Sequence, residues 1–318
     1  MDSSPLPLVL ITNAVPPGVL VPLKGIARVI QGPAGGDLMP RAEVLRLAPT
    51  LAGIINQAEL RVDAELLDAA PGLKVVANVA IGVDNLDLAL LRRRGVVATN
   101  VPDAFVESTA DCTLGLILAV ARRLPEADGF VRSGAWQQFQ PGRWDGTLLH
   151  GKTLGIVGYG KIGRAVEKRA RAFGMHVIHY RRSPAGGAGL TTLHELLRIS
   201  DFVSLHTPLN AESDRLLNEK RLARMKPGAF LINMARGRVV DEQALVAALQ
   251  SGHLAGAALD VFEDEPRVHP ALRAMKQVVL SPHLGGGTIE ARRAARLLCA
   301  QNVAAVLQGR PPLHPVVR

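Results

Sequence analysis

Short apolar runs alternate with helix-like, amphipathic stretches along the whole chain. In the first hundred residues each apolar run is followed by a helical or turn segment. The runs are LVLIT (8–12), RVIQG (28–32), GIINQ (53–57), KVVANV (74–79) and VVATN (96–100). Strands that alternate with helices in this way predict a parallel sheet.

A second series of the same kind begins after residue 150. Its runs are KTLGIVG (152–158), MHVIHY (175–180), DFVSLH (201–206), AFLINM (229–234), AALDV (257–261) and QVVLSPH (277–283), with helices predicted at 161–173, 192–199 and 241–250. We therefore predict an α/β protein with two doubly wound parallel-sheet domains. Thr192 and Glu195 have the spacing of a capping box, and Gly95 and Gly252 stand where helices are expected to end.

Two stretches mark where the chain passes between these domains. After the strand that ends near Asn100, Pro102 breaks the chain and a long apolar helix begins. A run of three glycines precedes a helix over 288–307, which we expect to return to the first domain. These crossings predict one domain of residues 1–100 and 285–318 and another of residues 101–284, with a hinged cleft between them.

Composition excludes several classes of protein. Of the 318 residues 48% are hydrophobic, which suffices for two cores, and no apolar run approaches the length of a membrane span. The N-terminus carries an acid where a signal peptide has basic residues, so we expect a cytoplasmic protein. Cys112 and Cys299 lack the spacing of metal ligands, and no metal site is predicted.

The charge balance raises the question of a nucleic-acid partner. There are 37 Lys and Arg residues against 28 Asp and Glu residues, a net charge of +9. The basic residues are dispersed in short groups, and aromatic residues, on which bases would stack, make up only 3% of the chain. We expect no nucleic-acid partner, although a basic cleft for small anions stays open.

The sequence GYGKIG (158–163) has the spacing of a dinucleotide-binding turn. Gly158, Gly160 and Gly163 would serve the tight turn, the approach of a pyrophosphate and the packing of the helix. The strand TLGIV precedes the turn and a helix follows it directly, so the first amides of that helix would point at the pyrophosphate. The surroundings make this motif far more specific than the glycines alone.

The end of the next strand indicates which dinucleotide is bound. A site that prefers NAD places Asp or Glu there to bind the ribose, but no acid occurs between Glu167 and Glu195. Arg181, Arg182 and Ser183 stand at this position instead and would attract a 2′-phosphate. We therefore predict NADP(H) in preference to NAD(H).

Three polar residues follow the last predicted strands of the second half. Arg236 lies in INMARGRVVDE, Glu265 in LDVFEDEP and His283 in SPHLGGGT. Beside a nicotinamide site they would supply a cation for a carboxylate, an acid to orient a histidine and a proton donor for a carbonyl. This set predicts hydride transfer to a keto acid.

These motifs in this order resemble those of the D-isomer-specific 2-hydroxyacid dehydrogenase family, which includes glyoxylate and hydroxypyruvate reductases. The similar stretches are VANVAIGVDNLDL, TNVPDAFVESTAD, GYGKIG, HTPLNAESDRLLN, INMARGRVVDE, LDVFEDEP and SPHLGGGT. The resemblance implies a Rossmann-type cofactor domain inserted into a flavodoxin-like substrate domain. It also implies a homodimer formed through the cofactor domain.

The resemblance further implies a role for individual residues. Arg236, Glu265 and His283 would be catalytic, and Arg236 would bind the substrate carboxylate together with the amides of Ile81 and Gly82. Glu265 would raise the pKa of His283 and so keep a proton available near neutral pH. The implied cofactor contacts are Thr109, Gly158, Tyr159, Gly160, Lys161, Ile162, Gly163, Arg181, Arg182, Ser183, Thr207, Pro208, Ala235 and Asp260.

The substrate itself stays open at this point. Relatives often carry GSAT or GSGT after the catalytic histidine, whereas this chain has Gly286 and Gly287 at the two middle positions. We expect a small 2-oxo acid such as glyoxylate or hydroxypyruvate, with 2-ketogluconate and arylpyruvates as alternatives. A different class of function is a dinucleotide-sensing regulatory protein, because some family members act as corepressors.

Overall fold

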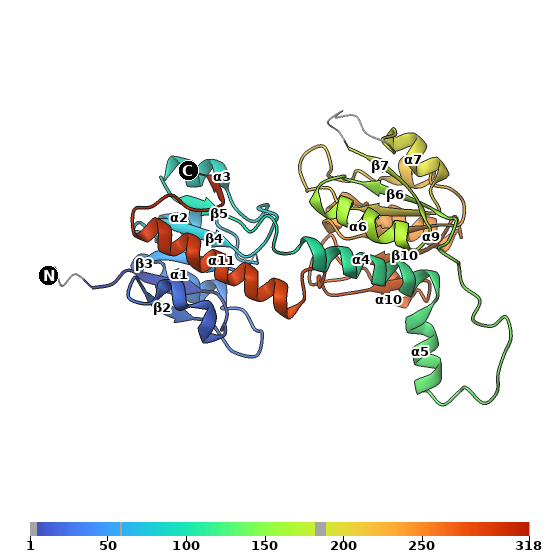
Figure 1. Ribbon diagram of the computed structural model, residues 1–318, viewed down its shortest axis with the longest axis horizontal. Coiled ribbons are helices and arrows are strands. Elements are labelled where there is room, and N and C mark those ends of the chain that lie inside the picture. Colours follow the sequence, from blue (N-terminus) through green and yellow to red (C-terminus); the bar gives the residue numbers. More distant parts are fainter. Residues whose placement is uncertain (1–4, 58, 182–188, 318) are drawn as a thin grey trace. The chain divides into compact units, whose positions relative to one another are not determined.

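The chain folds into two compact units, each built around a parallel sheet (Figure 1). The computed structural model describes residues 5–57, 59–181 and 189–317. The first unit consists of Met1–Phe105 and Thr288–Arg318, and the second of Val106–Gly287. The predicted class, two doubly wound α/β domains, is confirmed. The predicted domain boundaries, after residues 100 and 284, stay a prediction.

The first unit has helices on both faces of its sheet. Its strands are β1 (Leu8–Ile11), β2 (Arg28–Gln31), β3 (Leu51–Asn56), β4 (Val75–Asn78), β5 (Val97–Thr99) and β12 (Pro315–Val317), in the order β12-β5-β4-β3-β1-β2. Helices α1 (Arg41–Leu47), α2 (Ala64–Ala69) and α3 (Leu88–Arg93) cover one face, and α11 (Ile289–Leu307) covers the other. Only β12, which was not predicted, is antiparallel to its neighbour among these strands.

Alternation along the strands explains the two cores of this unit. Leu10 and Ile54 pack beneath α1 to α3, while Ile11 and Ile55, one residue further on, pack beneath α11. Because successive side chains of a strand point to opposite faces, an almost continuous apolar run fills both cores.

The second unit repeats this arrangement with all of its strands parallel. Its strands are β6 (Thr153–Val157), β7 (His176–Tyr180), β8 (Phe202–Leu205), β9 (Ala229–Asn233), β10 (Leu254–Leu259) and β11 (Val278–Leu280), in the order β11-β10-β9-β8-β6-β7. One face carries α4 (Val106–Ala121) and α6 (Lys161–Ala172), and the other carries α7 (Leu193–Ile199), α8 (Glu219–Leu222), α9 (Glu242–Gln250) and α10 (Pro270–Ala274). Helix α5 (Leu124–Arg132) buries none of its residues and extends away from this unit (Figure 1).

The predicted helix ends are confirmed. The side chain of Thr192 accepts a hydrogen bond from the amide of Glu195 at 3.1 Å, at the start of α7. Gly95 and Gly252 have φ angles of 68° and 71° just after α3 and α9, a conformation that suits glycine.

In both sheets the strand order reverses beside the first strand of the unit. The reversal lies between β1 and β3 in the first unit and between β6 and β8 in the second. Ligands of open α/β sheets bind outside the carboxyl ends of the strands at such points. No helix among the described residues is long and apolar enough to cross a membrane.

Candidate active site

The turn after β6 is shaped by its three glycines. Gly158 has a φ of 98°, and a Cβ there would lie 2.5 Å from the carbonyl carbon of His206, which follows β8. A Cβ on Gly163 would lie 2.5 Å from the carbonyl oxygen of Gly158. Both glycines are therefore needed for close packing inside the protein.

Gly160 differs, because it faces open space. It is the residue before α6, and a Cβ there would meet no atom within 4 Å. Lys161 and Ile162 begin the helix, and the cap residue Gly160 has no side chain that could bond its first amides. An open glycine at the start of a helix is a cradle that fits the pyrophosphate of a dinucleotide.

Tyr159, the second residue of this turn, has partners within the protein. Its ring stacks on that of His179, with the centroids 3.6 Å apart, and its hydroxyl donates to the carboxylate of Glu167. Burial, followed by the hydrogen bond to Glu167, raises the pKa of Tyr159. The side chain thus braces the turn against β7, while the carbonyl of Tyr159 accepts from Nη1 of Arg164 at 3.3 Å.

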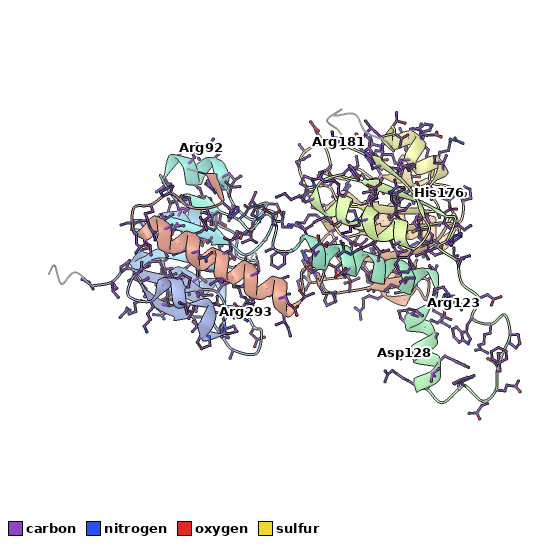
Figure 2. The ribbon with its side chains drawn as sticks, viewed as in Figure 1. Arg92, Arg123, Asp128, His176, Arg181 and Arg293 are labelled. Atoms are coloured by element: carbon purple, nitrogen blue, oxygen red, sulfur yellow. The ribbon has the colours of Figure 1, made fainter. Side chains whose placement is uncertain are left out.

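Arg181 directly follows β7, as the sequence predicts, and is labelled in Figure 2. Arg182 and Ser183 lie outside the described residues. Beyond them the chain returns alongside β7, because the amide of His179 donates to Gly189 and the amide of Thr191 donates to His179. The ribose position predicted from the sequence is therefore flanked by Arg181 at the end of a fully formed strand.

The segment after β8 borders the same turn. The amide of His206 donates to Val157 at 2.7 Å, and Nε2 of His206 lies 2.8 Å from the hydroxyl oxygen of Ser204. Burial lowers the pKa of His206 to about 3, so its ring is neutral. Thr207 and Pro208 come next, and the carbonyl of Pro208 accepts from the hydroxyl of Ser213. These contacts fix the predicted cofactor residues of this loop.

Arg236 lies in a turn that follows β9. The buried side chain of Asn233 donates to the carbonyl of Arg236 and accepts from the amide of Ala235. Nη1 of Arg236 donates to the carbonyl of Ala235 at 2.8 Å. The carbonyl of Ala235, one of the implied cofactor contacts, therefore already has one partner within the protein.

Gly237 brings this turn against the segment that contains Glu265. A Cβ on Gly237 would lie 1.8 Å from the carbonyl carbon of Phe262 and 2.3 Å from the nitrogen of Glu263. The buried Glu242 at the start of α9 accepts from the amide of Glu263 at 2.7 Å. Backbone contact and a carboxylate together set the position of the acidic segment.

Glu265 and His283 form a pair. Nδ1 of His283 donates to Oε2 of Glu265 at 2.8 Å, while Oε1 accepts from the amide of Phe262 at 3.0 Å. Burial acts to raise the pKa of Glu265, but the hydrogen bond and charge of His283, with a smaller effect of Arg236, lower it overall. The carboxylate thus stays ionised and orients the ring.

Asp260 holds the loop that carries His283. Its Oδ1 accepts from the hydroxyl of Ser281 and the amide of Leu284, and its Oδ2 accepts from the amide of Gly285. The amide of His283 donates to the carbonyl of Asp260, and His283 has a φ of 51°. The resemblance implied that Asp260 contacts the cofactor, but this bracing role was not predicted.

Thr109 belongs to the same corner of the second unit. It is buried on α4, and a Cβ on Gly285 would lie 3.5 Å from its Cγ2 and 3.2 Å from Oδ2 of Asp260.

The Glu265 and His283 pair also borders an apolar cavity of about 310 Å³ lined by Phe262, Pro266, Val268, Leu280, Ser281 and Pro282. The second unit therefore brings Arg236, Glu265, His283 and the glycine turn to one edge of its sheet.

Ile81 and Gly82 lie in the loop after β4 of the first unit. The carbonyl of Ala80 accepts from the amide of Val101, and the carbonyl of Ile81 accepts from the side chain of Asn100 at 2.8 Å. Since the C=O and N–H of one peptide point in opposite directions, these bonds turn the amides of Ile81 and Gly82 the other way. Asn78 likewise holds the carbonyl of Gly82.

The sequence did not predict several of these bracing residues. They are Asn100, Gly237 and Glu242, which all lie within the family-like motifs, one to six residues from a strand end or a predicted site residue. The feature that could have identified them is the presence of a polar residue or a glycine close to a strand end. Among the described residues no group of three His, Cys, Asp or Glu side chains could hold a metal ion.

Comparison with known proteins identifies relatives across the whole chain. The family model described as D-isomer specific 2-hydroxyacid dehydrogenase, NAD binding domain, matches residues 114–285. The glyoxylate reductase of Thermococcus kodakarensis is 44% identical over 316 residues, which cover 96% of this chain and 95% of that protein. The glyoxylate reductase of Pyrococcus furiosus is 43% identical and covers 86% of this chain and 84% of that protein.

Solved structures agree with these relatives. A protein of Thermus thermophilus has a TM-score of 0.93 at 44% identity, and the match covers 98% of this chain and 100% of that protein. The NADPH-dependent glyoxylate/hydroxypyruvate reductase of Sinorhizobium meliloti, in complex with NADP and malonate, has a TM-score of 0.84 at 34% identity and covers 98% and 96%. The resemblance drawn from the motifs is confirmed, and the chain belongs to the D-isomer-specific 2-hydroxyacid dehydrogenases, with a domain for a nicotinamide dinucleotide.

Proposed function

We propose that this protein reduces a small 2-oxo acid to the D-2-hydroxy acid with NADPH. The observation that carries the proposal is the hydrogen bond from Nδ1 of His283 to Glu265 in a unit whose glycine turn fits a dinucleotide. Family membership and the glyoxylate reductases among the relatives support it. The first unit is then the substrate domain and the second the cofactor domain, with boundaries near residues 100 and 284.

The proposed chemistry adds a hydride and a proton to one carbonyl. The reduced nicotinamide, when bound, supplies the hydride to the keto carbon. Arg236, a permanent cation, binds the carboxylate of the substrate, and the amides of Ile81 and Gly82 donate to the same group. His283 gives a proton from Nε2 to the carbonyl oxygen as it becomes an alkoxide, since Nδ1 is held by Glu265.

The preference for NADP(H) rests on the end of β7. Arg181 stands there, Arg182 and Ser183 follow it in the sequence, and no acid occurs until Glu195. A guanidinium binds a 2′-phosphate by charge-assisted hydrogen bonds, whereas an acid at this place would repel it. The remaining cofactor contacts proposed are Thr109, the turn from Gly158 to Gly163, Thr207, Pro208, Ala235 and Asp260.

We also propose a homodimer formed through the second unit. Helix α5 and the loop after it expose large apolar side chains, with Val131 52%, Trp136 58% and Phe139 82% exposed. Such a contiguous apolar surface is uncommon on a monomer and marks a contact with another protein chain. Sedimentation equilibrium of the full chain and of a Phe139→Ser variant tests this: a dimer that the variant weakens is expected, and a monomeric parent protein would refute it.

The experiment that tests the function is oxidation of NADPH, and in parallel NADH, by the purified protein with glyoxylate, hydroxypyruvate, 2-ketogluconate and phenylpyruvate. We expect turnover of one of the two small acids with NADPH preferred. Faster turnover of 2-ketogluconate or phenylpyruvate would assign the enzyme to those alternatives. Binding of dinucleotide without turnover of any acid would refute the enzyme and favour a dinucleotide-sensing regulator.

A further inference from the structure

A partly buried arginine of the first unit stands beside β3, and no acid among the described residues forms an ion pair with it. Arg296 projects from α11, and its Nε donates to Oε1 of Gln57 at 3.2 Å, the residue that follows β3. Burial and the charge of Arg292 lower the pKa of Arg296, and no described carboxylate forms an ion pair with it. A cation withdrawn from water without an acid is costly unless a ligand neutralises it.

Two neighbouring amides have polar atoms without partners. Asn13 is only 5% exposed, and its Oδ1 is buried without a hydrogen bond among the described residues. Nε2 of Gln57 is likewise buried without a hydrogen bond among the described residues. Most buried polar atoms of proteins are paired, so two orphaned amide atoms just past the ends of neighbouring strands point to a missing ligand.

The register of the sheet brings the ends of β1 and β3 side by side, and with them the segments that carry Asn13 and Gln57. Ile11 pairs with Ile55 across β1 and β3, and both side chains pack beneath α11. Asn13 and Gln57 come two residues later in the chain, just past the ends of these two strands. Gln57 is tied to β1 by its amide, which donates to the hydroxyl of Thr12. We call Asn13, Gln57 and Arg296 the Arg296 corner.

The corner stands where ligands of such sheets bind. It lies at the carboxyl ends of β1 and β3, between which the strand order of the first unit reverses. The next strand is β4, paired with β3 through Asn56 and Asn78, and it leads into the loop of Ile81 and Gly82. Adjacent strands lie ~4.8 Å apart, so the corner and that loop are neighbours along one edge.

We propose that the Arg296 corner binds an acid group, and that the preferred substrates are 2-oxo acids with a second carboxylate at the far end. The claim rests on the proposed function and narrows its substrate class. Arg296 neutralises the second carboxylate, and Nε2 of Gln57 donates to it. The side-chain amide of Asn13 has nearly the same shape in either orientation. A half-turn about its last bond therefore places the NH₂ group where Oδ1 lies now.

The test compares substrates with and without the second acid. The kcat/KM with NADPH is measured for glyoxylate, hydroxypyruvate and oxaloacetate, in the parent protein and in Arg296→Gln and Gln57→Ala variants. Arg293→Gln is the matched control, because it removes the same charge from an exposed position of the same helix (Figure 2). We expect oxaloacetate to be preferred, and Arg296→Gln to lower its kcat/KM at least tenfold while glyoxylate changes little.

A binding measurement tests the anion site of the Arg296 corner independently of the proposed enzymatic reaction. Inorganic phosphate is titrated by calorimetry into the parent protein, Arg296→Gln and Arg293→Gln, each saturated with NADP⁺ so that the phosphate-binding residues proposed in the second unit are occupied. Loss of phosphate binding in Arg296→Gln alone is expected, whether or not any 2-oxo acid is turned over. Absence of turnover with all acids would refute the proposed function and leave this result standing.

Two results would overturn the inference. If Arg296→Gln lowers kcat/KM equally for glyoxylate and oxaloacetate yet abolishes phosphate binding, the corner binds a separate anion and not the end of the substrate. If that variant matches Arg293→Gln in both experiments, the corner binds no acid. An Arg296→Lys variant that restores oxaloacetate turnover would support the requirement for a cation.

Discussion

Nδ1 of His283 lies 2.8 Å from Oε2 of Glu265, and the other oxygen of that carboxylate accepts from the amide of Phe262. Both oxygens of Glu265 are thus engaged, which fixes the acid and through it the imidazole ring. With Nδ1 occupied, Nε2 is the atom of His283 that can give a proton to a substrate.

Replacing His283 by Asn should remove the proton donor and leave the dinucleotide site intact. We expect kcat to fall about 10²- to 10⁴-fold, the usual size of a general acid's contribution. Glu265→Gln keeps the shape but not the charge, so a smaller loss is expected. Steady-state kinetics together with fluorescence titration of NADPH check this, and a large loss of NADPH affinity in His283→Asn would contradict it.

Replacing Gly237 by Ala should separate the Arg236 turn from the segment of Glu265. A Cβ there would overlap the carbonyl of Phe262, and relief of such a clash costs roughly 1–3 kcal/mol or more. We expect a lower free energy of unfolding in urea and a lower kcat. Gly115→Ala in α4 is the control, because a Cβ there meets no atom within 4 Å and should be neutral or stabilising.

Asn100 should affect the substrate more than the cofactor. Its Nδ2 donates to the carbonyl of Ile81, a bond that an ionised Asp cannot make. We expect Asn100→Asp to raise the KM for the 2-oxo acid roughly tenfold, in line with about 1–1.5 kcal/mol for one hydrogen bond. The affinity for NADPH, measured in the same preparation, should stay close to that of the parent protein; an equal loss of both would count against the assignment.

Arg181 should separate the two dinucleotides. Loss of a charge-assisted hydrogen bond costs about 1.5–3 kcal/mol, so Arg181→Ala is expected to raise the KM for NADPH about tenfold or more. The KM for NADH should change little. Arg198→Ala serves as the control, because Arg198 is exposed and paired with Glu195 in the same unit. Equal effects on both cofactors would exclude a role in binding the 2′-phosphate.

His206 should make the second unit sensitive to acid. Its pKa in the fold is about 3, below the ordinary 6.5, so the unfolded chain takes up a proton that the folded protein refuses. The stability that the neutral ring contributes is therefore full above pH 6.5 and is lost as the pH falls from there toward 3. Urea unfolding at about pH 7.5 and 5 should show a larger loss for the parent protein than for His206→Gln. Parallel losses would mean that another group titrates.

The pattern of apolar residues alone determined the α/β architecture. The runs that predicted β1 to β11 are short, apolar and flanked by glycine or polar residues, and such local features require no knowledge of distant contacts. The glycine turn at 158–163 and the position of Arg181 after β7 follow from the same local reading. Strand β12 could not be predicted, because its three residues pair with β5 only after α11 has returned the chain to the first unit.

Only the tertiary structure decided which polar groups brace one another. Asp260 binds the loop of His283, Gly237 touches Phe262, and Arg296 reaches Gln57 across 239 positions of sequence. Such partners are set by which strand ends are neighbours in the sheet, and the order of strands differs from their order in the chain. Sequence spacing therefore indicates that a residue stands at a strand end, but the packing of the sheet determines what it meets there.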